Sequence, residues 1–230
     1  MDVAVLYSGG KDSNAALQWA RQSGHSVGCI VGVVPEAMDS FMYHVPGTEL
    51  MGLFPEAVGE RLVKVRAPRN DELRPLRDAI AGSGVAGVVS GAVRSEFQKL
   101  RLDRLCAGLG LVHHAPFWHA DPERHLRELL SEGYDIIFTG VAAEGLDERW
   151  LGRRLDGEAL EALLRLRDRY GINLEGEGGE YETLVLSGPT HRRRIVIDES
   201  EALWRRDSGR LAVRRAHLEP PPGPAPNHRV

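Results

Sequence analysis

The chain has few cysteines and no long hydrophobic run, and each shortage excludes a class of protein. Cys29 and Cys106 are too few and too far apart for a disulfide framework, a CxxC redox pair or a cysteine-based zinc site. We expect both to be small core residues. No apolar run approaches the about 20 residues that a bilayer-spanning helix needs, and residues 1–3 begin a strand rather than a signal peptide. These absences predict a cytoplasmic protein with no membrane partner.

Composition and charge are those of an ordinary globular protein. Apolar residues make up 42% of the chain and charged residues 27%, enough to bury a core. The 29 basic and 33 acidic residues give a formal net charge of −4, so we expect no direct nucleic-acid partner. The run of arginines at 192–194 is expected to be a solvated strand edge, and it is also the only local patch in the sequence that could meet an acidic partner.

Strand-like and helix-like segments alternate through the first half of the chain. Apolar runs predict strands at residues 2–7, 26–34, 61–65, 85–90 and 111–118, and helical spacing predicts helices at residues 14–21, 48–59, 71–82 and 95–109. Strands that alternate with helices predict an α/β fold with a doubly wound parallel sheet.

The pattern changes after Asp121-Pro122. Helices are predicted at 122–132 and 158–170 around an apolar run at 134–143, followed by antiparallel strands at 183–188, 193–198 and 210–218. This second part is a smaller C-terminal α+β domain. The last residues are rich in proline, which is typical of a disordered tail. We therefore expect a first domain at 1–120, a second at 121–218 and a tail at 219–230.

A glycine-rich motif stands between the first predicted strand and the first predicted helix: Ser8, Gly9, Gly10, Lys11, Asp12 and Ser13. Glycines let the backbone present successive N–H groups to an anion, and the helix N-terminus and Lys11 add positive charge. The motif therefore predicts a pyrophosphate cradle. It is not a Walker A loop, because Val5 stands where that motif has its first glycine and Asp12 follows the lysine. The alternative is a glycine-rich turn with Asp12 or Ser13 as helix cap.

A second glycine follows another predicted strand in the same way. Gly91 comes just after the strand at 85–90, as Ser8 comes just after the strand at 2–7. If these strands flank the point where the strand order reverses, both loops lie in one crevice, where such sheets bind ligands. The alternative is that Gly91 only eases a turn.

Several segments together resemble a known family. SGGKDS resembles the signature of the PP-loop ATP pyrophosphatases, which have an adenine nucleotide alpha hydrolase-like fold and cleave ATP between the α and β phosphates. Within that superfamily the chain is similar to the diphthine–ammonia ligases at residues 40–44 (SFMYH), 91–98 (GAVRSEFQ), 145–153 and 176–183 (GEGGEYET). GEGGEYET is the most selective of these. Phe97 and Lys99 depart from the family pattern, which has tyrosine and arginine there.

The resemblance implies ATP and Mg²⁺ as cofactors and assigns roles to matching residues. The nucleotide-binding set is Ser8, Gly9, Gly10, Lys11, Asp12, Ser13 and Gly91. The catalytic set is Lys11, Asp12, Glu177, Glu180 and Glu182, with Asp12 also a metal ligand. The substrate-binding set is Tyr43, His44, Ser95, Gln98, Gly178, Gly179, Tyr181 and Thr183.

From the residues alone, several of these roles stay open. Ser95 and Gln98 equally suit a helix capping box. The glutamates of GEGGEYET could hold Mg²⁺, bind ammonium, accept its proton, or form a solvated loop. Tyr43 and His44 could be structural. The spacing of histidines 113, 114, 119 and 125 matches no common zinc pattern.

The resemblance implies an ATP-dependent ligase that forms a C–N bond. A carboxylate would be activated as an acyl-adenylate and then amidated by ammonium, with release of AMP and pyrophosphate. The implied acceptor is diphthine on translation elongation factor 2, and the product is diphthamide. The alternatives are a PP-loop enzyme with a different acceptor and a module that binds ATP or AMP without chemistry. Whether the chain forms a homo-oligomer stays open.

Overall fold

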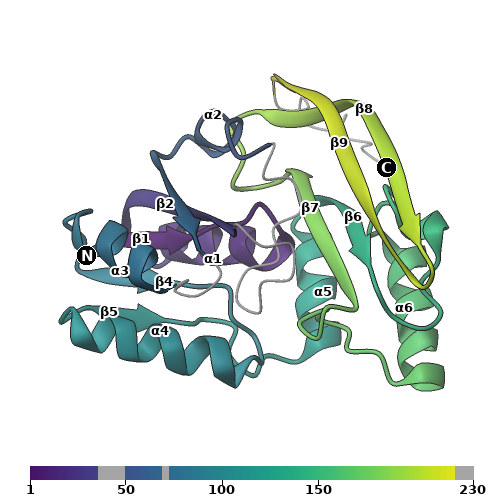
Figure 1. The fold of residues 1–230 in the computed structure, drawn as a ribbon, viewed down its shortest axis with the longest axis horizontal. Coiled ribbons are helices and arrows are strands. Elements are labelled where there is room, and N and C mark those ends of the chain that lie inside the picture. Colours follow the sequence, from purple (N-terminus) through teal and green to yellow (C-terminus); the bar gives the residue numbers. More distant parts are fainter. Residues whose placement is uncertain (36–49, 69–72, 221–230) are drawn as a thin grey trace, which may run out of the picture.

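A computed structural model describes residues 1–35, 50–68 and 73–220, which form two sheets with helices packed around them (Figure 1). The predicted substrate contacts Tyr43 and His44 lie outside these residues, as does most of the expected tail. Within the described ranges, every helix is too short or too polar to cross a membrane.

The first sheet confirms the predicted doubly wound architecture. It has five parallel strands in the order β3-β2-β1-β4-β5. Their bounds are β1 Asp2–Leu6, β2 Ser26–Pro35, β3 Leu62–Ala67, β4 Gly87–Val89 and β5 Val112–His114. The order reverses between β1 and β4. The loops that follow these two strands therefore flank the point at which open α/β sheets bind ligands.

Helices cover both faces of this sheet. They are α1 Lys11–Gln22, α2 Phe54–Val58, α3 Leu73–Ala81 and α4 Glu96–Gly108. Val3 and Val5 pack with α1 and α2, whereas Ala4 between them packs with α3 and α4. Strands buried on both faces read as continuous apolar runs, which is why the sequence predicts them.

The second sheet is antiparallel, with the order β7-β6-β9-β8. Its strands are β6 Asp135–Val141, β7 Tyr181–Ser187, β8 Arg194–Arg205 and β9 Ser208–Glu219, and its helices are α5 Pro122–Ser131 and α6 Gly157–Tyr170, with a 3₁₀ turn at Glu148–Trp150. Both helices share one apolar core with β6 and β7. This is the smaller α+β part that the sequence predicts.

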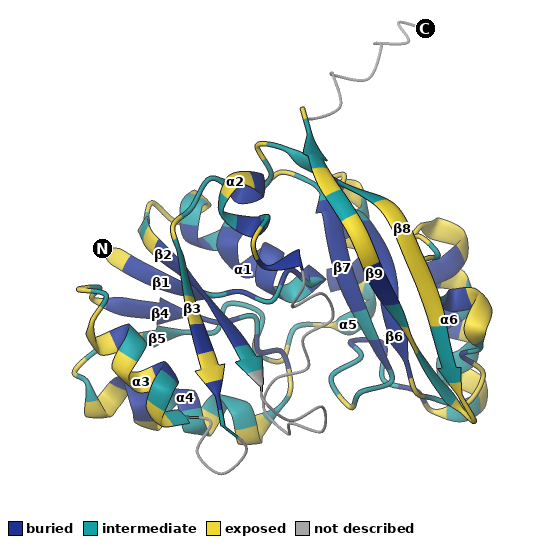
Figure 2. Ribbon diagram, turned by 45° about the horizontal axis from the view of Figure 1, so that its top comes forward, coloured by how far each residue is buried: buried dark blue, intermediate teal, exposed yellow. Residues whose placement is uncertain are grey.

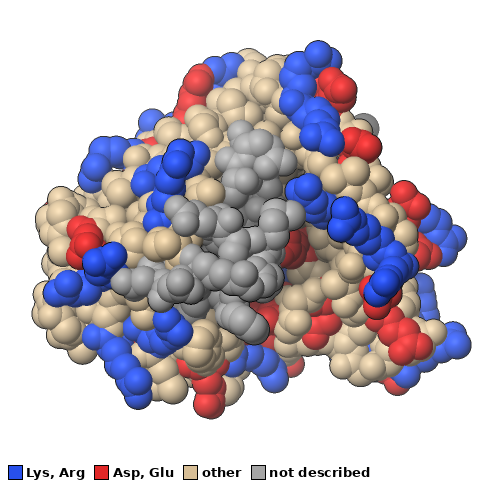
Figure 3. Space-filling model, in the orientation of Figure 1, with Lys and Arg blue, Asp and Glu red and all other residues tan. Residues whose placement is uncertain are grey.

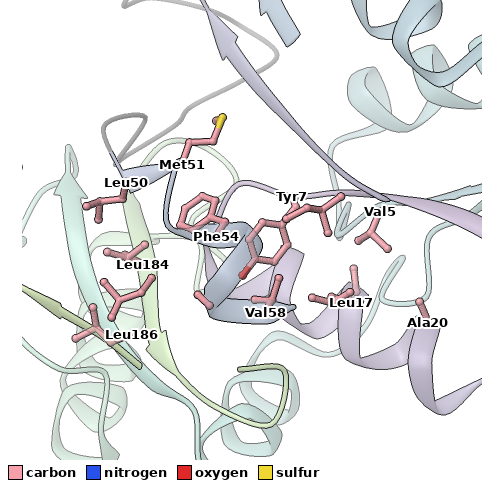
Figure 4. Packing of buried hydrophobic residues seen from close by; sticks show 14 of the residues in the cluster. Val5, Tyr7, Leu17, Ala20, Leu50, Met51, Phe54, Val58, Leu184 and Leu186 are labelled. Carbon is pink, nitrogen blue, oxygen red and sulfur yellow. The ribbon is translucent and has the colours of Figure 1, made fainter. Parts of the chain in front are cut away.

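One hydrophobic cluster joins the two sheets, because it contains buried residues of both. The rings of Tyr7 and Phe54 meet edge to face, with centroids 5.3 Å apart, in the same cluster as Leu184 and Leu186 of β7 (Figure 4). Desolvation of this apolar surface holds the halves together. As a result, the loop after β1 lies against β7.

Several element predictions differ from the structure in their bounds. The helix predicted at 48–59 is α2, Phe54–Val58, in the described residues. The strand predicted at 111–118 ends at His114, because Pro116 has no N–H for a ladder and the chain turns there, with the Trp118 amide donating to the Ala115 carbonyl at 3.2 Å. The first helix begins at Lys11 rather than residue 14. β8 and β9, of twelve residues each, form a hairpin whose outer parts are exposed (Figure 2). Acidic residues that break the apolar pattern can therefore extend the strands, and β9 runs to Glu219, the first residue of the expected tail.

Candidate active site

The loops after β1 and β4 are in direct contact, as the sequence predicts. A Cβ placed on Gly91 would lie 2.6 Å from the backbone carbon and oxygen of Asp12, so a side chain there would force the two loops apart. Gly9 has a φ of +84°, a conformation that glycine adopts without strain. Glycine is therefore required at both positions by geometry.

Two cavities lie where these loops face the segment at 175–182, which we call the acidic segment. Their volumes are about 240 and 130 Å³. Both are lined by Ser8, Asp12, Ser13, Gly176, Glu177 and Glu182; the larger adds Gly91, Gln98 and Gly179, and the smaller adds Gly10, Lys11, Glu175, Tyr181 and Thr183. Acidic side chains are visible in the hollow between the two halves (Figure 3). The fold thus brings together two motifs far apart in the sequence.

The backbone amides of the glycine-rich loop have hydroxyl partners. The Gly10 amide donates to Ser8 Oγ at 3.3 Å, and the Lys11 amide donates to Thr183 Oγ1 at 3.2 Å. Asn14 is buried, and its side-chain Nδ2 donates to the backbone carbonyls of Gly9 and Gly10 at 3.1 and 3.0 Å. The Asn14 side chain therefore holds the loop through its carbonyl groups. Asn14 could not be recognised from the sequence beyond its place after the motif.

Lys11 is buried and fully engaged. Its Nζ donates to Asp12 Oδ2 at 2.7 Å and to the carbonyl of Glu175 at 2.6 Å, and lies 5.4 Å from the centre of the Tyr181 ring. Burial by itself lowers the pKa of an ammonium, but the carboxylate of Asp12 and the Tyr181 ring reverse this and hold the Lys11 pKa above its ordinary value. The site therefore holds a fixed positive charge at neutral pH.

Asp12 contacts a residue that the sequence does not connect with it. Its Oδ1 lies 3.1 Å from Nε2 of His125, a buried residue of α5, while Oδ2 binds Lys11. Burial raises the pKa of Asp12, but Lys11 and His125 outweigh it and hold that pKa below its ordinary value. The carboxylate is thus ionised with both oxygens engaged, and a bound metal would compete with these partners for them. Nothing in the sequence places α5 beside the loop.

The three predicted glutamates have different surroundings. Glu177 accepts the backbone amides of Val93 and Arg94 at 2.7 and 2.5 Å, which ties the acidic segment to the loop after β4. Glu182 lines both cavities. Glu180 lines neither, and its Oε1 accepts the amide of Asn173 at 3.3 Å. The structure therefore brings Glu177 and Glu182 to the cavities and leaves Glu180 outside their lining.

Glu175 is a buried carboxylate that sequence reasoning missed. Only 1% of its side chain is exposed, and Arg94 Nε lies 3.0 Å from its Oε2. Burial raises the pKa of Glu175; Arg94 opposes this and the charge of Glu177 adds to it. Its position two residues before Glu177 was the available signal. The Glu175–Arg94 pair is a second tie between the acidic segment and the loop after β4.

The remaining predicted substrate contacts divide into two groups. Gln98 and Gly179 line the larger cavity, and Tyr181 and Thr183 pack around Lys11. Ser95 lines neither cavity and caps α4, accepting the Gln98 amide at 3.4 Å, and Gly178 also lies outside both linings. The capping alternative for Ser95 is therefore what the structure shows.

The histidines take separate structural places. His113 lies 2.8 Å from Ser90 Oγ and 2.6 Å from Asp103 Oδ1. His114 packs with the rings of Trp19 and His25. Across the part of the chain that the structure describes, no three His, Cys, Asp or Glu side chains are grouped to hold a metal ion.

Comparisons with known proteins identify the family of this chain. Residues 1–113 match the family model described as diphthamide synthase N-terminal domain, and residues 121–218 match the diphthamide synthase C-terminal domain. A rat protein named diphthine–ammonia ligase is 33% identical over 88% of this chain and 85% of its own length. The human protein of that name is 31% identical over the same shares.

A solved structure from Methanocaldococcus jannaschii, described as a predicted subunit of tRNA methyltransferase, is more distant. It is 18% identical and covers 82% of this chain and 97% of its own, with a TM-score of 0.43, too low to support an argument. The family assignment is supported by the two domain matches and by the relatives, whose similarity extends over most of both chains. This chain belongs to the diphthamide synthase family, whose named relatives are diphthine–ammonia ligases.

Proposed function

We propose that this protein is a diphthine–ammonia ligase that uses ATP to convert the carboxylate of diphthine into the amide of diphthamide. One observation carries the proposal. The glycine-rich loop and GEGGEYET, more than 160 residues apart, line the same two cavities. A nucleotide-activating loop and a carboxylate-rich segment are what an ATP-dependent amidation needs within reach of each other.

The reaction needs ATP because a carboxylate and ammonium form a salt rather than an amide. In the proposed first step, a carboxylate oxygen attacks the α phosphorus, and the bond to the bridging oxygen breaks to release pyrophosphate. In the second step, ammonium loses a proton to become ammonia, and the ammonia nitrogen attacks the acyl carbon. The acyl–oxygen bond breaks, AMP leaves, and the nitrogen loses a further proton to give the amide.

The glycine-rich loop would hold the pyrophosphate end. The hydroxyl partners of the Gly10 and Lys11 amides are neutral and lie at 3.2–3.3 Å, so a charged phosphate oxygen would be the stronger acceptor. The charge of Lys11 is fixed by its partners before the ligand arrives. Such preorganised charge is usually the largest contribution to stabilising a transition state.

Mg²⁺ is part of the proposal as a partner of the triphosphate. It would neutralise charge on the phosphates, and it commonly takes only one or two protein carboxylates when phosphates supply other ligands. Asp12 lines the smaller cavity and is the predicted ligand. Its two oxygens contact Lys11 and His125, so Mg²⁺ would have to take the place of one of these partners.

Ammonium would enter among the same carboxylates. Glu177 and Glu182 line both cavities, whereas Glu180 lines neither. Glu177 and Glu182 are therefore our candidates for binding ammonium and accepting its proton. The acceptor protein would be translation elongation factor 2, in the cytoplasm, with Gln98, Gly179, Tyr181 and Thr183 near the acceptor.

The test is amidation of diphthine-bearing elongation factor 2 with ATP and ammonium, with AMP and pyrophosphate measured together with the amide. Lys11→Ala should lose at least about a hundredfold in turnover, because the charge beside the departing pyrophosphate is gone. Lys64→Ala is the matched control, since Lys64 is exposed on β3. Thermal melting of both variants checks folding. Normal turnover by Lys11→Ala, or ATP binding by wild type without AMP release in the complete mixture, would refute the proposal.

A further inference from the structure

A surface groove of about 670 Å³ lies between α3 and α4, outside the site described above. Phe97 and Leu100 of α4 line it with exposures of 52% and 51%. They are two of the four large apolar side chains that are exposed among the described residues. Exposed apolar groups gathered in one groove are typical of an interaction surface.

Four arginines surround these apolar side chains. Arg74 and Arg77 come from α3, and Arg101 and Arg104 from α4. A spacing of three residues places each pair on one helix face. The guanidinium of Arg101 lies 4.8 Å from the centre of the Phe97 ring. The chain has a net charge of −4, whereas the lining of this groove carries positive charge.

The sequence does not reveal this cluster of four arginines, because its two pairs lie on different helices and are far apart along the chain. The run at 192–194, which the sequence offers instead, is already engaged, since Arg193 pairs with Glu56 and donates to the carbonyl of Leu218 at 2.8 Å. Within the groove, Arg77 lies 3.7 Å from Asp78. Lys and Arg side chains are visible over α3 and α4 at the lower left of Figure 3.

The groove begins beside the candidate active site. α3 and α4 follow β3 and β4, so both helices start at the carboxyl edge of the sheet, where the cavities lie. Gln98 lines the larger cavity, and its neighbour Phe97 lines the groove. A protein bound in the groove would therefore lie next to the cavity that its modified side chain must enter.

We propose that this groove docks an acidic segment of the acceptor protein, with an apolar side chain against Phe97 and Leu100 and carboxylates on the arginines. The inference rests on the proposed function for the identity of the acceptor. A protein segment suits the groove better than RNA, because the lining between the arginines is aliphatic at Leu73, Leu100 and Leu105 and offers a single aromatic ring for stacking. Arginine binds carboxylates through two parallel N–H donors, which gives such a contact direction.

The experiment compares two double charge reversals in the full chain. Arg77→Glu/Arg104→Glu changes the groove. Arg165→Glu/Arg169→Glu changes exposed positions of α6 and shifts the net charge equally. Binding of diphthine-bearing elongation factor 2 is measured directly, without ATP, at low and at physiological salt, and the KM values for the acceptor and for ATP are measured in the amidation assay.

We expect the groove variant to weaken acceptor binding and raise the acceptor KM by about tenfold at low salt, with a smaller effect at higher salt. The KM for ATP and the melting temperature should stay as in wild type, and the α6 variant should behave like wild type. Unchanged acceptor binding by the groove variant, or an equal loss in the α6 variant, overturns the inference. So does a result in which the groove variant loses only RNA binding or only self-association.

Failure of the two proposals can be told apart. If wild type binds the acceptor through the groove but does not amidate it, the ligase proposal fails and the docking surface stands. If wild type amidates the acceptor and the groove variant does so with an unchanged KM, the docking surface fails and the ligase proposal stands.

Discussion

The contact of Glu177 with the loop after β4 leads to a prediction about local order. Its two carboxylate oxygens accept the amides of Val93 and Arg94 at 2.7 and 2.5 Å. Glutamine keeps the shape but has one acceptor oxygen, and its NH₂ group would face an N–H donor. Glu177→Gln therefore loses one charge-assisted hydrogen bond and leaves one donor without an acceptor, which costs about 1–3 kcal/mol.

That cost should appear as faster hydrogen exchange of the two amides. An energy of about 1–3 kcal/mol corresponds to about a 5- to 150-fold change in the local opening equilibrium. Amide exchange followed by NMR at Val93 and Arg94 measures it. Glu180→Gln is the matched control, because Glu180 accepts the amide of Asn173 instead and should leave these two sites unchanged. Exchange rates at Val93 and Arg94 within twofold of wild type in Glu177→Gln would refute the reasoning.

Two further predictions concern packing and pH. Gly91→Ala should weaken ATP binding at least about tenfold, because the new Cβ would meet the Asp12 backbone at 2.6 Å. Gly157 has open space around it, so Gly157→Ala is the control and should bind ATP normally. Calorimetric titration with ATP measures both affinities. Burial, together with the charge of Arg21, lowers the pKa of His191 to about 4. As the pH falls below 6.5, the unfolded chain therefore takes up a proton at this histidine before the folded chain does. The free energy of unfolding should fall by up to about 3 kcal/mol as the pH drops from 6.5 towards 4. His191→Asn should remove that part of the loss in denaturant titrations at pH 7 and pH 4.5, and an unchanged difference between the two pH values would contradict the assignment.

Local chain properties determined the first sheet and the glycine-rich loop. A parallel strand is buried on both faces, so runs such as residues 26–34 can be read as strands without knowing their neighbours. The loop at 8–13 can also be recognised locally, because glycines between a strand and a helix allow backbone conformations that other residues adopt only with strain. Ser95 could be read both as a helix cap and as a substrate contact, and the structure shows the cap, which needs only its own helix.

Contacts between distant residues were decided by the tertiary structure alone. Nothing near His125 in the sequence indicates that α5 brings it to Asp12, and the burial of Glu175 against Arg94 depends on two loops that meet only after both sheets have packed. The four arginines of the α3–α4 groove likewise become one surface only when the helices lie side by side. Side-chain type and spacing fix what each segment can form, but which segments meet is set by burial of the shared core, which sums many weak contacts along the whole chain.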